Sequence, residues 1–170
     1  TLEDALLIYH FSVGSPVSDF VKSVSNKKLL IYHNITPGEF FRGYEDYIRS
    51  VLDKGREELR HFVNLCDLAV GDSEFNRLEL EKLGFPRTGV LPIIVDFDKY
   101  DHNPDPATLQ RFEDDWTNII FVGRLAPNKC QEDIIHAFCV YKRCVNPKSR
   151  LFLIGLGGIE RYDFMLHELV

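Results

Sequence analysis

The sequence lacks the features that would predict a membrane-spanning, zinc-binding or P-loop protein. No apolar run approaches the ~20 residues of a transmembrane helix, and no signal peptide opens the chain. The four cysteines form no Cys-x-x-Cys pair and have no histidine at zinc-ligand spacing, so we expect free thiols in a reducing compartment. No Gly-x-x-x-x-Gly-Lys-[Ser/Thr] sequence is present, which excludes a P-loop. We therefore expect a cytoplasmic protein without metal or cofactor, and peripheral contact with the inner face of a membrane stays open.

Positive charge is also scarce. The chain carries 20 Lys and Arg against 26 Asp and Glu, for a formal net charge of −6 and a pI of about 5.5. This balance argues against nucleic acid as a partner. The carboxylates are scattered along the chain and show no pairing of the kind that glycosidases use. Hydrophobic residues make up 45% of the chain, which is enough for the core of one or two ordinary domains.

Apolar runs of strand length alternate with amphipathic patterns, which predicts an α/β fold with parallel sheets. Residues 5–9 and 29–32 are apolar at successive positions, so we expect strands buried on both faces. The longest helical pattern covers residues 39–65. The remaining expected strands are 67–70, 89–95, 119–122 and 151–154. The remaining expected helices are 17–24, 74–83, 107–112, one that begins soon after Asn128 and ends near Cys144, and 161–170.

The composition changes between residues 96 and 116. This stretch is acidic, interrupted by prolines and without a long apolar run, as is typical of a connection between domains. We therefore expect one Rossmann-like unit in residues 1–95, a linker in 96–116 and a second Rossmann-like unit in 117–170.

The segment 118–138 combines an apolar strand that we expect to be buried, a loop with two cations and a helix start. Gly123 ends the strand and permits a close backbone approach. Arg124 and Lys129 lie in the loop, just before the helix. Free N–H groups at a helix start, the helix dipole and two cations together favour an anion such as a diphosphate. A strand-to-helix turn without a ligand is the alternative that spacing alone leaves open.

Two histidines each follow an apolar strand. His10 and His33 should therefore lie at the carboxyl end of the sheet, where open α/β sheets bind their ligands. Either side chain could contact a substrate or move a proton, and a histidine hydrogen-bonded in a loop is the alternative. The Gly-Leu-Gly-Gly turn at 155–158 does not match the dinucleotide-binding spacing, because Glu160 occupies the place of the last glycine.

Four stretches form one pattern in their order and spacing: residues 68–77, the Pro-Ile-Ile-Val-Asp at 92–96, the Val-Gly-Arg-Leu at 122–125 with Lys129, and residues 151–155. Together they resemble GT-B glycosyltransferases of family 4. Such enzymes have two Rossmann-like domains, and each would be incomplete in this chain. The resemblance implies that a sugar moves from a UDP- or GDP-sugar donor to a hydroxyl of a carbohydrate or lipid-linked acceptor, with retention, in polysaccharide, glycoconjugate or glycolipid synthesis.

The same resemblance implies roles for individual residues. Arg124 and Lys129 would hold the donor diphosphate, and Gly123 would let the backbone approach it. His33 would be the catalytic residue facing the donor sugar or the acceptor. No metal is implied, because arginine, lysine and helix dipoles neutralise the phosphate charge in this family. Further candidates for the donor site or the cleft are Gly155, Gly157, His10 and Ser73.

The chain departs from the family pattern in ways that leave alternatives. Cys130 replaces the glycine that usually follows the key lysine, and Ile94 replaces a glycine of the interdomain link. The Glu-x7-Glu segment that binds the donor sugar is absent, as is the N-terminal Gly-rich loop, so the chain resembles a fragment. The alternatives are another GT-B sugar-nucleotide enzyme such as an epimerase, and a non-catalytic nucleotide-binding module.

Overall fold

The structure is a computed structural model that describes residues 4–170. The chain divides into two compact units. The first comprises the described residues through Arg42 together with Asp46–Val95, and the second comprises Gly43–Glu45 and Asp96–Val170. The predicted α/β class with parallel sheets is confirmed in both units.

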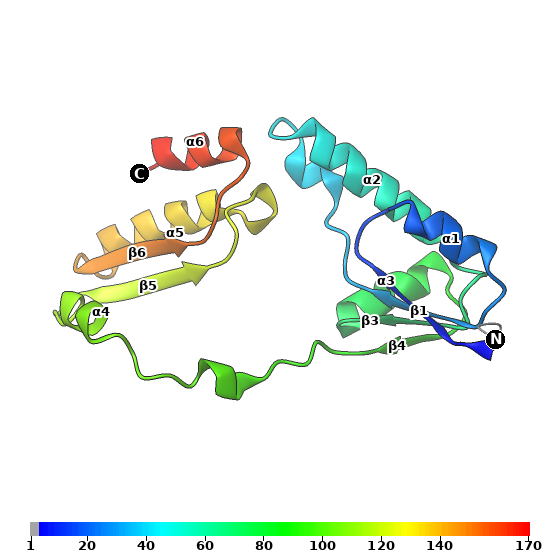
Figure 1. Ribbon diagram of the computed structural model, residues 1–170. Coiled ribbons are helices and arrows are strands. Elements are labelled where there is room, and N and C mark those ends of the chain that lie inside the picture. The colour runs from blue at the N-terminus through cyan, green and yellow to red at the C-terminus, as the bar shows by residue number, and fades with distance from the viewer. Residues whose placement is uncertain (1–3) are drawn as a thin grey trace. The chain divides into compact units, whose positions relative to one another are not determined.

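The first unit is built on a four-stranded parallel sheet in the order β1-β2-β3-β4 (Figure 1). The order follows the chain, so each crossover connects neighbouring strands. The strands are β1 Leu7–Phe11, β2 Lys28–Tyr32, β3 Leu68–Gly71 and β4 Thr88–Val90, and the helical elements are α1 Val17–Ser23, the 3-10 helix η2 Gly38–Phe41, α2 Asp46–Arg60 and α3 Glu74–Leu83.

One face of this sheet forms the main core. Alternate residues of β1 and β2 pack with apolar residues of the three α-helices and of the turn after α2. The core includes Tyr9, Phe11, Val21, Leu30, Tyr32, Leu59, Phe62, Ala69 and Leu80. The expectation that β1 is buried on both faces is wrong, because β1 is an edge strand and Ile8 is 52% exposed on the opposite face. His10 lies on that same opposite face.

Two predicted elements of the first unit are shorter than expected. The predicted helix 39–65 is broken, because Arg42 is extended and Gly43 has a left-handed φ of 83° between η2 and α2. The predicted strand 89–95 ends at Val90. Leu91 N–H makes a last bond to the Gly71 carbonyl, and the following Pro92 has no N–H to continue the ladder.

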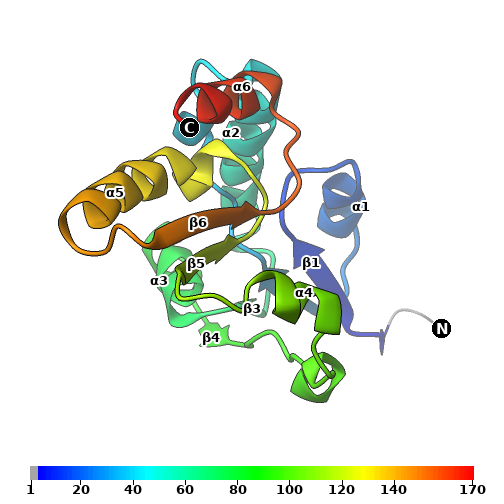
Figure 2. The ribbon, with the colours of Figure 1, turned by 90° about the vertical axis from the view of Figure 1, so that its left-hand side faces the viewer.

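The second unit is smaller and contains a two-stranded parallel sheet (Figure 2). Exposure alternates along β5, so Ile120 and Val122, at 60% and 75% exposed, lie on an open face. The prediction that this strand is buried is therefore wrong, because the sheet has only two strands and packs on one face. The elements are η3 Phe97–Tyr100, α4 Pro106–Arg111, β5 Thr117–Val122, η4 Pro127–Lys129, α5 Gln131–Cys144, β6 Ser149–Ile154 and α6 Glu160–Glu168.

Candidate functional site

The turns that follow β5 and β6 pair through their backbones. Gly123 N–H donates to the Ile154 carbonyl and Leu125 N–H donates to the Leu156 carbonyl, each over 2.9 Å. A Cβ on Gly155 would lie 1.8 Å from the Gly123 carbonyl oxygen, so only glycine permits this approach. The structure thus brings together two glycines that the sequence singled out separately.

Gly157 has a packing role in the same turn. A Cβ there would lie 2.3 Å from a carboxylate oxygen of Asp163, and the same carboxylate accepts the Gly158 N–H over 3.0 Å. The carboxylate thereby closes the turn onto the first turn of α6.

The two loop cations have a fixed backbone and free side chains. The Arg124 carbonyl accepts a hydrogen bond from Gln131 Nε2 over 3.0 Å, and Lys129 N–H donates to the Ala126 carbonyl over 2.9 Å. Both residues are exposed, and neither side chain has an ion pair or hydrogen bond with any residue between 4 and 170. This arrangement suits an anionic ligand at the carboxyl end of β5.

The start of α5 is less available to an anion than its position predicts. Gln131 N–H donates to Tyr162 Oη over 2.9 Å, and Asp133 N–H donates to the Cys130 carbonyl over 3.1 Å. The carboxylates of Glu132 and Asp133 also occupy the first turn, where they compete with an anion for the dipole. The side chains of Arg124 and Lys129 are therefore the better anion ligands here.

A buried polar cluster fixes this loop. Tyr162 Oη lies 2.9 Å from Gln131 Oε1 and also contacts the Glu132 carboxylate, while Gln131 holds the Arg124 carbonyl. Burial, and secondarily the hydrogen bond to Glu132, raises the pKa of Tyr162. The hydroxyl therefore stays protonated and can donate. Sequence patterns gave no signal for this cluster, because Tyr162 is 31 residues from Gln131 and 30 residues from Glu132 in the chain.

Cys130 keeps the backbone conformation that a glycine would have at this position of the loop. It adopts the left-handed conformation, with φ 50° and ψ 47°, between η4 and α5. This is the conformation that glycine adopts at little cost. The replacement therefore retains the backbone path but carries strain.

Three side chains meet near the carboxyl ends of β1, β2 and β3. His10 Nδ1 lies 2.8 Å from His33 Nε2, and His33 Nδ1 lies 3.0 Å from Asp72 Oδ2. The imidazole rings are nearly parallel, with centroids 5.1 Å apart and an interplanar angle of 10°. Both histidines were expected at this site from the sequence, whereas Asp72 was not. The sequence feature that could have identified Asp72 is its position directly after β3, which matches the position of His33 directly after β2.

A half-buried network holds the loop after His33. Tyr32 Oη accepts the Ile35 N–H over 3.0 Å and donates to Glu79 Oε2 over 2.8 Å. Arg56 donates to the Ile35 carbonyl over 2.6 Å and pairs with Glu79. Burial raises the pKa of Tyr32, so its hydroxyl remains a donor. The network thereby fixes the backbone beside the histidine pair.

Ser73 has a capping role. Its hydroxyl accepts the Asn76 N–H over 3.3 Å at the start of α3. A Cβ on Gly71 would lie 2.7 Å from the Arg77 nitrogen, so glycine lets the first turn of α3 approach the end of β3. Ser73 therefore sits beside Asp72, with its side chain engaged in the helix cap.

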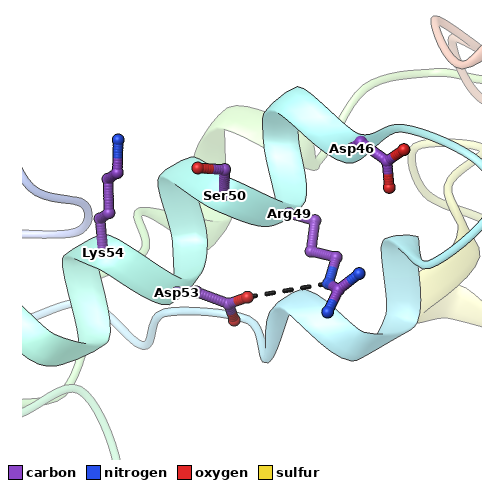
Figure 3. A pocket seen from close by; sticks show the side chains of 5 residues that line it. All are labelled: Asp46, Arg49, Ser50, Asp53 and Lys54. Atoms are coloured by element: carbon purple, nitrogen blue, oxygen red, sulfur yellow. Dashed lines mark ion pairs between the residues drawn. The ribbon is translucent and has the colours of Figure 1, made fainter.

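A hollow on the surface of α2 lies away from the strand ends. Figure 3 shows its lining side chains, which come from one helix and include an Arg49–Asp53 ion pair of 3.8 Å. The charges are of both signs and partly cancel, so no ligand class is indicated. The lining residues are Asp46, Arg49, Ser50, Asp53 and Lys54.

Residues 4–170 contain neither a cluster of metal-ligating side chains nor an apolar helix of membrane-spanning length. That part of the chain holds no group of three or more His, Cys, Asp or Glu side chains arranged to bind a metal. None of its helices is long and apolar enough to cross a bilayer.

Comparison with known proteins gives a match in structure only. No protein-family model and no curated protein matches the sequence. Among solved structures, the chain is similar to a mutant of S. aureus TarM in complex with fondaparinux, α-GlcNAc-glycerol and UDP. The TM-score is 0.52 at 13% sequence identity, and the match covers 86% of this chain and 28% of that chain. This chain therefore spans 28% of the length of that protein and shares its GT-B-like α/β fold, in two units that each contain a parallel sheet.

Proposed function

We propose that this chain is part of a glycosyltransferase of the family 4 type, which moves a sugar from a nucleotide diphosphate to an acceptor hydroxyl. The first unit would serve the acceptor side and the second the donor side. The observation that carries the proposal is a pair of exposed cations, Arg124 and Lys129, whose side chains have no partner within residues 4–170, on a backbone held by Gln131 and η4. A diphosphate is the anion that such a pair at a strand end suits.

The chemical role of the cations follows from where charge develops. As the bond from the sugar to the diphosphate breaks, negative charge grows on the leaving diphosphate. Arginine and lysine stabilise that charge more in the transition state than in the bound donor, which accelerates transfer. One charge-assisted hydrogen bond of this kind contributes about 1.5–3 kcal/mol.

Two further arguments support the donor class. The TarM structure contains UDP together with a sugar derivative, which fits a UDP-sugar donor, and a GDP-sugar is the second candidate. Four stretches of the sequence resemble family 4, including the Val-Gly-Arg-Leu at 122–125. Carbohydrates and lipid-linked sugars are the acceptors that this assignment proposes.

Calorimetric titration with UDP, GDP and ADP tests the donor site. We expect one diphosphate to bind, and Arg124→Ala to weaken its binding by about 10- to 100-fold through loss of a charge-assisted bond. Lys129→Ala should act in the same direction. Arg143→Ala removes an exposed cation from the last turn of α5, the helix that follows this loop, and is the matched control. Equal losses in Arg143→Ala and Arg124→Ala, or no binding by the folded protein, would overturn the proposal.

The product tests the reaction class. Incubation with the diphosphate sugar that binds should give a glycoside whose anomeric proton shows the configuration of the donor, as retention requires. Free epimerised sugar formed without an acceptor would instead identify an epimerase. Nucleotide binding without any product would identify a non-catalytic module.

A further inference from the structure

The histidine pair and Asp72 form one hydrogen-bonded chain with a single free end. Asp72 lies against His33 Nδ1, and His33 Nε2 lies against His10 Nδ1. Both ring nitrogens of His33 are therefore engaged inside the protein, and its side chain is 31% exposed. His10 is exposed, and its Nε2 has no partner among the residues that the structure describes. Only His10 can offer a ring nitrogen to a ligand while the chain stays intact.

The Asp72 carboxylate determines which ring nitrogens of His33 and His10 carry hydrogen. An ionised carboxylate can only accept, so His33 Nδ1 carries the hydrogen that Asp72 binds. Nε2 of neutral His33 then holds a lone pair, and His10 Nδ1–H donates to it. Neutral His10 is left with a lone pair on Nε2. The free end of the chain is therefore a hydrogen-bond acceptor.

A proton gained at the free end has a defined path. When His10 Nε2 takes a proton, the hydrogen on His10 Nδ1 can pass along the 2.8 Å contact to His33 Nε2. The positive charge then lies on His33, beside the Asp72 carboxylate at 3.0 Å. An imidazolium is stabilised by a carboxylate at this distance. The cluster can thus accept one proton at its surface and hold the charge next to a counter-ion.

We propose that His10, and not His33, is the residue of this cluster that contacts substrate. His10 Nε2 accepts a hydrogen bond from a sugar hydroxyl and then its proton, while the hydroxyl oxygen keeps the bonding electron pair. His33 and Asp72 are positioning residues, which fix the tautomer and hold the charge. The claim that the ligand is a sugar rests on the proposed function. The claim that His10 is the free end of the hydrogen-bonded chain rests on the geometry of the three residues alone.

Reaction with diethyl pyrocarbonate tests which histidine of the cluster has an accessible ring nitrogen, because the reagent acylates imidazole nitrogens that are unprotonated and accessible. We expect mass-spectrometric mapping to find His10 modified at a rate similar to that of exposed His136 on α5. His33 should react about tenfold more slowly, since a hydrogen bond must open first. In His10→Gln, the freed His33 Nε2 should react about tenfold faster than in the wild type. Equal reactivity of His10 and His33 in the wild-type protein would overturn the assignment of His10 as the accessible histidine. This comparison uses the wild-type protein alone, so it does not depend on whether a variant folds.

The tautomers give a second readout, which a purely structural role would not predict. Long-range ¹H–¹⁵N spectra of the wild-type protein should show both neutral rings with hydrogen on Nδ1. Asp72→Asn should lose this preference, because an amide can donate as well as accept. Hydrogen on Nε2 of neutral His10 in the wild type would contradict the assignment.

Sugar contact is tested separately. We would repeat the acylation with methyl glucosides, galactosides and mannosides, and we expect at least one of them to slow modification of His10 without slowing that of His136. If none does so, the substrate contact is wrong. Failure of UDP, GDP and ADP to bind at Arg124 and Lys129 would instead remove the proposed function, and the measured order of His10 and His33 would be unaffected.

Discussion

Replacement of Gly155 by alanine should selectively destabilise the second unit. The added Cβ would lie 1.8 Å from the Gly123 carbonyl oxygen, which is backbone and cannot rotate away. Ordinary contact requires the two turns to separate by about 1.5 Å. The 2.9 Å hydrogen bonds from Gly123 and Leu125 to the turn after β6 would then exceed the hydrogen-bond limit.

The loss can be estimated from those two bonds. At about 1 kcal/mol each, the free energy of unfolding should fall by about 2 kcal/mol, within the range for overpacked sites. For a unit of this size, the Tm should fall by about 8–16 °C. Gly123→Ala is the matched control across the same contact. Its Cβ would meet only the edge of the Phe121 ring at 3.3 Å, which a small rotation relieves, so we expect a change within about 0.5 kcal/mol.

Tryptophan fluorescence provides the assay. Trp116 is the only tryptophan of the chain and belongs to the second unit, where the cations of Lys142 and Arg150 lie over its ring at 5.3 and 5.5 Å. Its signal therefore reports the unfolding of this unit. Gly155→Ala should also weaken diphosphate binding, since Arg124 lies between the two lost bonds. A Gly155→Ala protein as stable as Gly123→Ala would refute the close contact between the two turns.

Three further predictions concern single side chains. Cys130→Gly should stabilise the second unit by about 0.5–1 kcal/mol in the fluorescence assay, because left-handed strain exceeds the entropy cost of glycine. Cys139→Gly, inside α5, should instead destabilise it by about 0.3 kcal/mol, and effects of the same sign for the two variants would contradict the strain. Tyr32→Phe should destabilise the first unit by about 1–3 kcal/mol in circular dichroism melts, since it leaves the buried Ile35 N–H without its acceptor and removes one of the donors to Glu79. Tyr100→Phe, at a 75% exposed position, should have little effect. Burial raises the pKa of Cys66 to about 11, so its thiolate is scarcer at pH 8 and iodoacetamide should modify it about 100-fold more slowly than exposed Cys139. Similar rates for the two thiols would contradict the buried position.

Local pattern was sufficient for most of the fold. Apolar runs followed by amphipathic stretches predicted the alternation of strands and helices, because burial of those runs is what forms the sheets. The errors arose where one residue outweighed a long pattern. Gly43 interrupts a helical pattern through its left-handed φ of 83°, and Pro92 ends a strand because it has no N–H to donate.

Some features of the candidate site were likewise set by the local sequence, and others only by the tertiary structure. The sequence by itself determined that Arg124 and Lys129 share one loop, and that His10 and His33 each lie at a strand end, because these are properties of neighbouring residues. Only the tertiary structure decided that Asp72 orients His33, that Tyr162 occupies the start of α5, and that Gly155 meets the Gly123 carbonyl. These partners are separated by about 30 or more residues in the chain. Strand register and helix packing place them together, and neither is encoded in the spacing of adjacent residues.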